Sequence, residues 1–156
     1  MKISTRGRYA LRMLLDLAEH QGEGYVSLTD IAERQQISKK YLEQIIPLLS
    51  KSNFLLTVRG MSGGYRLARD PSEYTVGELL RLTEGSLAPT SCLKNDPNEC
   101  EMYEQCRSIC VWEGLLKVMT DYLDSLTLQD VLEQNKRRVL QIRPIDHTQG
   151  GRRHIC

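Results

Sequence analysis

The sequence predicts a mostly α-helical protein with a small β-hairpin wing, arranged as a winged helix-turn-helix domain followed by a long helix. Two observations support this fold class. Three helical patterns lead directly into two short apolar segments joined by the glycine-rich tip "GMSGG", which is the element order of a winged helix-turn-helix. A longer helical pattern then follows a cysteine-rich loop. The 156 residues, 40% of them hydrophobic, suit one domain of ordinary size or a small domain with a helical extension.

The first three patterns predict helices. From Thr5, apolar residues recur at three- and four-residue spacing until the glycines of "HQGEGY" end the pattern. Ser27, with Asp30 three residues later, resembles a capping box and opens a short second helix. A third helix opens at Ser38, and Pro47 is expected to bend its last turn. The residues of this helix expected to face inward are Leu42, Ile45, Ile46 and Leu49.

The next two elements are a hairpin and a fourth helix. "FLLTVRGMSGGYRLARD" predicts two strands, with glycines between residues 60 and 64 supplying the positive φ angles that a tight tip needs. Thr75 and Glu78 form a second capping box, which predicts an amphipathic helix that ends at Gly85.

The C-terminal part predicts two more helices. The longer one is expected to begin at about Glu104, and Thr127 is the expected N-cap of the last one. The tail 143–156 has no apolar period and is expected to be disordered. The long helix must pack on its own domain or on a second copy, because its apolar residues fall close to a heptad seam. These are Trp112, Leu115, Leu116, Met119, Tyr122, Leu123 and Leu126. Three aromatic residues are expected in the core, namely Tyr25, Phe54 and Trp112.

Charge is unevenly distributed along the chain, although the net charge is only +1. Residues 1–70 hold 11 Lys and Arg against 7 Asp and Glu, residues 71–126 hold 4 against 10, and residues 127–156 hold 6 against 3. A basic N-terminal part is suited to meet a polyanion, whereas the acidic middle is not.

The chain is expected to be cytoplasmic. No apolar run approaches the roughly 20 residues that span a membrane, and "MKISTRGRYA" lacks the apolar region of a signal peptide. Thiols stay reduced in the cytosol, so clustered cysteines there bind metal or sense redox state more often than they form structural disulfides.

The outer face of the third helix and the hairpin tip are candidates for DNA contact. Short polar, basic and amide side chains on that helix can reach phosphates and base edges. Arg59 and Arg66 flank the tip, whose glycines allow close backbone approach to a phosphate or a minor groove. A solvated helix face is the alternative interpretation of the polar stripe. The candidates on the helix are Ser38, Lys39, Lys40, Tyr41, Glu43 and Gln44.

Four of the five cysteines lie between Ser91 and Cys110. Cys92, Cys100 and Cys106 have the spacing C-x7-C-x5-C, which lacks the paired knuckles of zinc fingers and suits a loop around a larger iron-sulfur cluster better than one ion. Cys110 follows Cys106 by four residues and is expected on the same side of one helix. Free thiols, a reversible disulfide and structural zinc are the alternatives. No catalytic constellation or small-molecule site is evident, so an enzyme is not expected.

The stretches "STRGRYAL", "YLEQI", "VRGMSGGYRLAR" and "TVGELL", with a three-cysteine loop before a tryptophan-bearing helix, resemble the Rrf family of bacterial winged-helix regulators. The resemblance is strongest to its iron-sulfur cluster regulator branch and covers residues 1 to about 135. It implies a homodimer formed through the long helix, a [2Fe-2S] cluster, and control of iron-sulfur cluster assembly genes from double-stranded promoter DNA. The implied cluster ligands are Cys92, Cys100 and Cys106. The implied DNA contacts are Ser38, Tyr41, Glu43, Gln44, Arg59, Ser62, Gly63 and Gly64.

One position departs from the family pattern. Relatives place a histidine ligand three residues after the third cysteine, where this chain has Ile109. We expect Cys110 to supply the fourth ligand, with a carboxylate such as Glu104 or a ligand from a partner subunit as alternatives. Arg8 replaces the acidic ligand of the relatives that sense nitric oxide, and the cysteine loop speaks against the relatives without a cluster.

The expected organisation is a DNA-binding domain over residues 1–84, a cluster-binding loop over 85–106, and a dimerisation helix with a C-terminal helix over 107–142. Glu43 is expected to discriminate between operators rather than to add affinity, because a carboxylate repels phosphate and accepts hydrogen bonds only from a base such as cytosine. A winged helix that binds protein instead of DNA is a further alternative.

Overall fold

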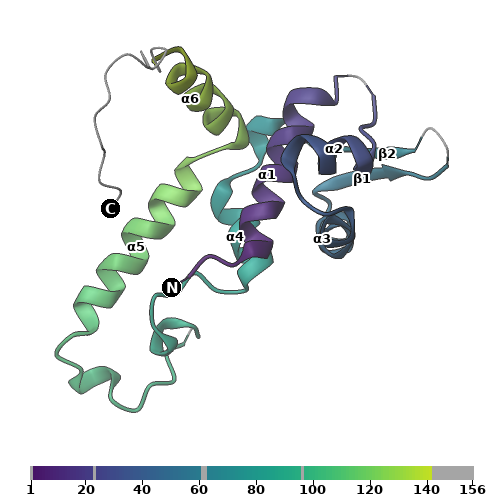
Figure 1. The fold of residues 1–156 in the computed structure, drawn as a ribbon. Coiled ribbons are helices and arrows are strands. Elements are labelled where there is room, and N and C mark those ends of the chain that lie inside the picture. The colour runs from purple at the N-terminus through teal and green to yellow at the C-terminus, as the bar shows by residue number, and fades with distance from the viewer. Residues whose placement is uncertain (1, 23, 61–62, 96, 142–156) are drawn as a thin grey trace, which may run out of the picture.

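A computed structural model describes residues 2–22, 24–60, 63–95 and 97–141. Most of these residues are helical, and two strands form an antiparallel hairpin (Figure 1). The predicted fold class is therefore confirmed. None of the helices in this part of the chain combines the length and the apolar character needed to cross a membrane.

The first three helices are α1 (Thr5–His20), α2 (Leu28–Gln35) and α3 (Lys39–Lys51). Each begins after a serine whose Oγ accepts a hydrogen bond from a backbone N–H three residues later, which satisfies one of the unpaired donors of a helix start. α3 continues through Pro47, which lies on its exposed side. The four residues predicted to face inward from α3 are all buried.

The hairpin consists of β1 (Leu55–Val58) and β2 (Gly64–Leu67), with Leu55 opposite Leu67. Gly60 has φ +116°, as predicted for the tip, whereas Gly63 and Gly64 do not adopt a positive φ. Tyr65 exchanges two backbone hydrogen bonds of 2.9 Å with Val26, directly before α2. The wing is thereby joined to the start of the helix-turn-helix.

One apolar cluster forms the core between α1, α2, α3 and the hairpin. Phe54 is 2% exposed, as predicted, and its backbone O accepts a hydrogen bond from the hydroxyl of the buried Tyr74. Tyr25 was predicted in the core, but 39% of it is exposed. The Arg66 guanidinium lies 5.7 Å from the centroid of its ring, so a cation–π contact replaces burial.

The fourth helix, α4 (Val76–Glu84), begins at the predicted Thr75 cap and ends at Gly85, which has φ +80°. It is linked by side chains to three other segments. Ser4 Oγ donates to Glu84 at 2.7 Å, and Arg69 donates to Glu78 at 2.9 Å. Arg81 makes two hydrogen bonds of 2.7 and 2.6 Å to Asp124 in the next helix. The helix that precedes the cysteine loop is thus bonded to α1, to the segment after the wing and to α5.

The long helix α5 runs over Ile109–Ser125 and extends away from the winged-helix core (Figure 1). The predicted start at Glu104 was wrong, because Tyr103–Gln105 form a separate 3₁₀ turn that ends at an extended Cys106. No residue of α5 is fully buried, and Trp112 is half-buried instead of lying in the core.

The apolar residues of α5 fall on two faces. Leu123, with Leu126 just after the helix, packs on a cluster that contains Val76 and Leu80 of α4. A second stripe is exposed to solvent and was only partly included in the predicted seam. It consists of Val111, Leu115, Val118 and Tyr122, which are 57, 41, 66 and 60% exposed.

The last helix, α6 (Leu128–Gln141), begins as predicted after Thr127, which exchanges hydrogen bonds with Asp130. Its first residue, Leu128, is fully buried in the main core. α6 therefore packs back on the winged-helix domain, against α1 and the 3₁₀ turn Pro71–Glu73. The tail that was predicted to be disordered, residues 143–156, lies outside the described residues.

Candidate functional site

The outer face of α3 presents the polar residues that the sequence singled out. Ser38, Lys39, Lys40, Glu43 and Gln44 are exposed. Ser38 Oγ accepts a hydrogen bond from the Tyr41 N–H at 3.3 Å, so this side chain caps the helix. Tyr41 is half-buried, because its ring meets the edge of Tyr9 with 5.2 Å between centroids.

A groove of about 830 Å³ separates α3 from the hairpin. Lys39 and Glu43 line it from α3, and Arg59, Gly63 and Gly64 line it from the wing. The fold thus brings together two predicted sites that are about 20 residues apart in the sequence. Ser62, also predicted to contact DNA, lies outside the described residues. The remaining α3 candidates lie outside the groove lining and are Ser38, Lys40, Tyr41 and Gln44.

The α2 side of the groove was missed by sequence reasoning. Ser27, Leu28 and Thr29 line it at the first turn of α2, where unpaired backbone N–H groups favour an anion. The Ser27 cap was the available signal, because it fixed where this helix begins.

The glycines of the wing have a structural reason beyond close approach to DNA. A Cβ at Gly63 would lie 2.8 Å from the Gly60 O, and a Cβ at Gly64 would lie 2.8 Å from the Val26 carbonyl carbon. Both distances are shorter than any ordinary contact. These glycines let the tip fold tightly and let β2 lie against Val26.

The charges at the groove are available to a ligand. Within the described ranges, no ion pair involves Lys39, Lys40, Arg59 or Glu43. Uncompensated lysine and arginine side chains beside a groove attract a polyanion. Glu43 is an acidic side chain in the same groove and opposes that attraction.

The cysteine loop forms a second candidate site. Cys92, in the 3₁₀ turn Ser91–Leu93, and Cys100 line one small pocket with Asn95 and Glu99. Asn98 joins the two, since its Nδ2 donates to the Cys92 O at 2.5 Å and its Oδ1 accepts from the Cys100 N–H at 2.8 Å.

Cys106 and Cys110 lie apart from that pocket. Hydrogen bonds from Ser108 Oγ and from the backbone N–H groups of Ser108 and Ile109 lower the pKa of Cys106 below its ordinary value. Cys106 precedes α5, whereas Cys110 is exposed in its first turn. The expectation that the two share one side of a helix was therefore wrong.

The donor chemistry of the loop suits a soft metal or cluster, but the geometry does not assemble it. Four thiols are free, and thiolates are the ligands that iron-sulfur clusters use. Within the part of the chain that the structure describes, no three Cys, His, Asp or Glu side chains are close enough to hold a metal ion. Binding would require the loop to rearrange so that Cys106 approaches the pocket of Cys92 and Cys100.

Comparisons with known proteins identify relatives of this chain. Residues 3–134 match the family model Rrf2, described as an iron-dependent transcriptional regulator. The chain is 36% identical to the HTH-type transcriptional regulator IscR of Pectobacterium atrosepticum over 91% of this chain and 84% of that protein.

Two solved structures are similar. One is T. potens IscR, with a TM-score of 0.70, 40% identity, and coverage of 88% of this chain and 90% of that one. The other is CymR, the global cysteine regulator of B. subtilis, with a TM-score of 0.71, 34% identity, and coverage of 86% and 98%.

Proposed function

The chain belongs to the Rrf2 family of iron-dependent transcriptional regulators, and we propose that it binds promoter DNA as a homodimer and senses iron-sulfur cluster status through a [2Fe-2S] cluster. Its targets in this proposal are genes for iron-sulfur cluster biogenesis, and it acts in the cytoplasm without catalysing a reaction. The observation that carries the proposal is the groove between α3 and the wing, which is lined by Lys39 and Arg59, neither of which forms an ion pair within the described residues.

In the proposed complex, α3 enters the major groove and the wing lies along the backbone or the minor groove. Lys39 and Lys40 contact phosphates, while Gln44 and Glu43 face base edges. Arg59 extends from the wing toward the narrower groove, where arginine is favoured.

The proposed dimer forms through α5. Its exposed stripe repeats at intervals of four, three and four residues from Val111 to Tyr122, which is the spacing of a helix-helix seam. A stripe with this much exposed apolar surface is typical of an interface.

The proposed cluster ligands are Cys92, Cys100 and Cys106, with Cys110 as the fourth. A bound [2Fe-2S] cluster would supply a one-electron redox couple and an oxygen-labile site. The loop that carries Cys92, Cys100 and Cys106 connects α4 to α5, and Cys110 lies in the first turn of α5, so ordering the loop would affect the link between the DNA-binding domain and the dimer helix.

Anaerobic purification tests the cofactor proposal. We expect a coloured protein with iron and acid-labile sulfide near two each per chain, as a [2Fe-2S] centre requires. Cys110→Ala should change the visible spectrum and the reduction potential. Zinc in place of iron would contradict the proposal, and an unchanged spectrum in Cys110→Ala would exclude Cys110 as a ligand.

A thiol-disulfide switch is the second candidate function. It is favoured by the arrangement of Cys92 and Cys100, which line one pocket while Cys106 lies outside it. Metal-free protein whose DNA binding changes on oxidation, with loss of the change in Cys100→Ser, would support this alternative.

A further inference from the structure

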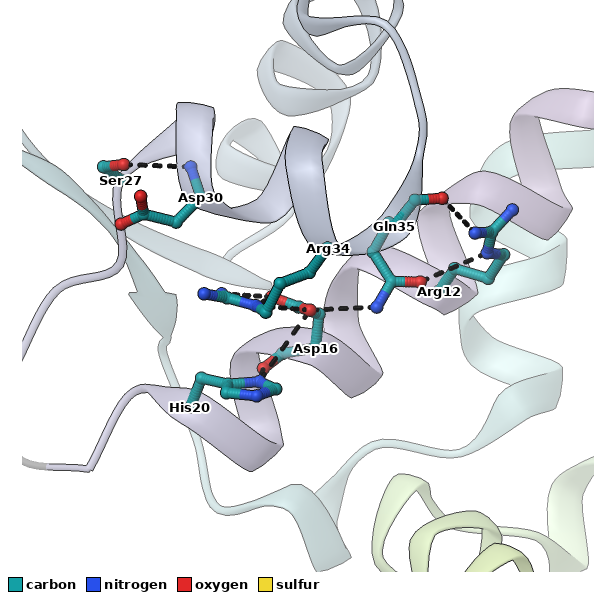
Figure 2. Close-up of polar contacts among 7 residues, drawn as sticks. All are labelled: Arg12, Asp16, His20, Ser27, Asp30, Arg34 and Gln35. Atoms are coloured by element: carbon teal, nitrogen blue, oxygen red, sulfur yellow. Dashed lines mark hydrogen bonds and ion pairs between the residues drawn. The ribbon is translucent and has the colours of Figure 1, made fainter.

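Asp16 is the one charged side chain buried among the described residues, with 1% of its surface exposed. Its carboxylate accepts hydrogen bonds from Arg34 Nε at 3.0 Å, from Arg34 Nη2 at 2.6 Å and from Gln35 Nε2 at 2.9 Å (Figure 2). His20 Nδ1 lies 3.8 Å from the same carboxylate. We call Asp16, Arg34 and Gln35 the Asp16 cluster. It joins the C-terminal half of α1 to the last two residues of α2.

The cluster does more than fill space between two helices. Apolar side chains of similar size usually stabilise such a position as well as a buried ion pair does. A bidentate carboxylate–guanidinium pair instead forms in only one relative orientation of the two side chains. The pair therefore fixes which residues of α2 lie against α1.

The position of α2 is transmitted to α3 through a short, hydrogen-bonded turn. Only Gln36, Ile37 and Ser38 separate the end of α2 from the start of α3. Gln36 has φ 51°, and its N–H bonds back to α2, as does the Ile37 N–H at 3.1 Å to the Ala32 O. This turn has little freedom to absorb a shift of α2.

A second connection reaches the outer face of α3. Gln35 Oε1 accepts a hydrogen bond from Arg12 Nε at 3.2 Å, and the Arg12 guanidinium also donates to the Gln35 backbone O (Figure 2). Arg12 lies over the ring of Tyr9 at 5.6 Å, and Tyr9 meets Tyr41 edge to face. Because Asp16 holds the amide of Gln35, it also orients Arg12 and the two rings.

We propose that Asp16 is a positioning residue for DNA recognition, which sets the angle of α3 and the place of Tyr41 by holding Arg34 and Gln35. This inference rests on the proposed function, in which α3 reads DNA. It predicts that the cluster controls discrimination between sequences, whereas the surface lysines and arginines control general attraction to DNA.

The test is Asp16→Asn, which keeps the size of the side chain and removes its charge. A duplex selected by the wild-type chain from a random pool serves as the specific probe, and an unrelated duplex of equal length is the non-specific one. We expect affinity for the specific duplex to fall by about tenfold, as when one good base contact is misplaced. Affinity for the unrelated duplex and its salt dependence should not change, since the phosphate-contacting residues remain.

Two further variants separate an effect on DNA recognition from a general effect on folding. Asp124→Asn breaks an equally bidentate pair with Arg81 that lies outside the helix-turn-helix, and it should leave the ratio of the two affinities as in the wild type. Gln35→Leu removes the amide that bonds to both Asp16 and Arg12 and leaves the Asp16–Arg34 pair in place. It should lower the ratio severalfold, and it decides the question if Asp16→Asn does not fold.

An unchanged ratio in folded Asp16→Asn, or an equal loss for both duplexes, would overturn the inference. Failure of the wild-type chain to select any duplex would instead overturn the proposed function itself.

Discussion

At the scale of single residues, substitution of Arg34 and substitution of Asp16 should cost different amounts of unfolding free energy. The partner that remains is buried in the first case and partly exposed in the second. Arg34→Met leaves a fully buried carboxylate without its counter-charge, which costs about 3–5 kcal/mol of unfolding free energy. Asp16→Asn leaves a guanidinium that is 34% exposed and reaches water, so we expect a loss of about 1–2 kcal/mol. Urea denaturation of both variants measures the difference.

Arg81→Met, at a pair whose side chains are about 40% exposed, is the control and should cost about 1 kcal/mol or less. Equal losses for Arg34→Met and Asp16→Asn would contradict this asymmetry.

The same carboxylate makes stability depend on pH. Burial raises the pKa of Asp16, but hydrogen bonds from Arg34 and Gln35 and the charges of Arg34 and His20 outweigh this and lower the pKa below 3.8. A lowered folded-state pKa contributes stability above the unfolded pKa, and this contribution is lost as pH falls through the folded pKa. The stability difference between wild type and Asp16→Asn should therefore be constant near neutral pH and shrink below about pH 4. If the stability difference between wild type and Asp16→Asn instead grew as the pH fell, folding would raise the pKa of Asp16 and not lower it.

Glu43 is the residue whose charge opposes the cationic groove. Because it repels phosphate and accepts from few bases, Glu43→Ala should enlarge the set of duplexes selected from a random pool while keeping or raising affinity. Lys40→Ala is the contrasting control, and it should lower the affinity for every duplex by a similar factor. Identical enriched sequences before and after Glu43→Ala would show that this carboxylate does not discriminate.

At the scale of secondary structure, periodicity and capping residues predicted most elements well. The caps Ser27, Ser38, Thr75 and Thr127 each precede a helix as expected, because the capping hydrogen bond is local to a few residues. The start of α5 was misplaced, since the turns of the cysteine loop have no periodic signal and residues 103–105 have a helical composition. Local patterns could not place Tyr25 either, because its exposure depends on where Arg66 of the hairpin lies.

The exposed stripe of α5 supports a specific prediction about assembly. Val118→Asp places a charge at its most exposed apolar position, 66% exposed, so the folded chain tolerates it while an apolar dimer interface does not. Sedimentation should show the dimer dissociation constant raised by about tenfold or more with an unchanged circular dichroism spectrum. Gln134→Asp, on the exposed side of α6, should leave the dimer intact. Unchanged dimerisation of Val118→Asp would place the interface elsewhere.

At the scale of the whole molecule, the fold and the side-by-side placement of α3 and the wing at the groove were largely predictable, but the arrangement of the cysteines was not. The groove combines two motifs with strong local signals, the capped α3 and the glycine-rich wing. Cysteine spacing shows that the thiols share a loop, but it does not determine how the loop folds. The structure joins Cys92 and Cys100 in one pocket and leaves Cys106 and Cys110 apart. Sequence reasoning also missed the Asp16 cluster, because nothing local marks a buried pair between residues 18 positions apart.

α4 connects these sites within one chain. It is bonded to α1 through Glu84, to the segment after the wing through Glu78 and to α5 through Arg81, and the cysteine loop leaves directly from its end. A change in the order of that loop therefore has a short route to both the winged-helix domain and the proposed dimer helix.

The most direct test of cluster sensing is DNA binding by cluster-loaded and cluster-free protein from one anaerobic preparation. Fluorescence anisotropy on the wild-type-selected duplex, with iron and sulfide measured on each sample, gives the comparison. We expect the affinity for that duplex to differ by about tenfold or more between the two forms, a coupling of usual size, or the two forms to select different sequences. Equal affinity and identical selected sequences in both forms would contradict a cluster-sensing regulator.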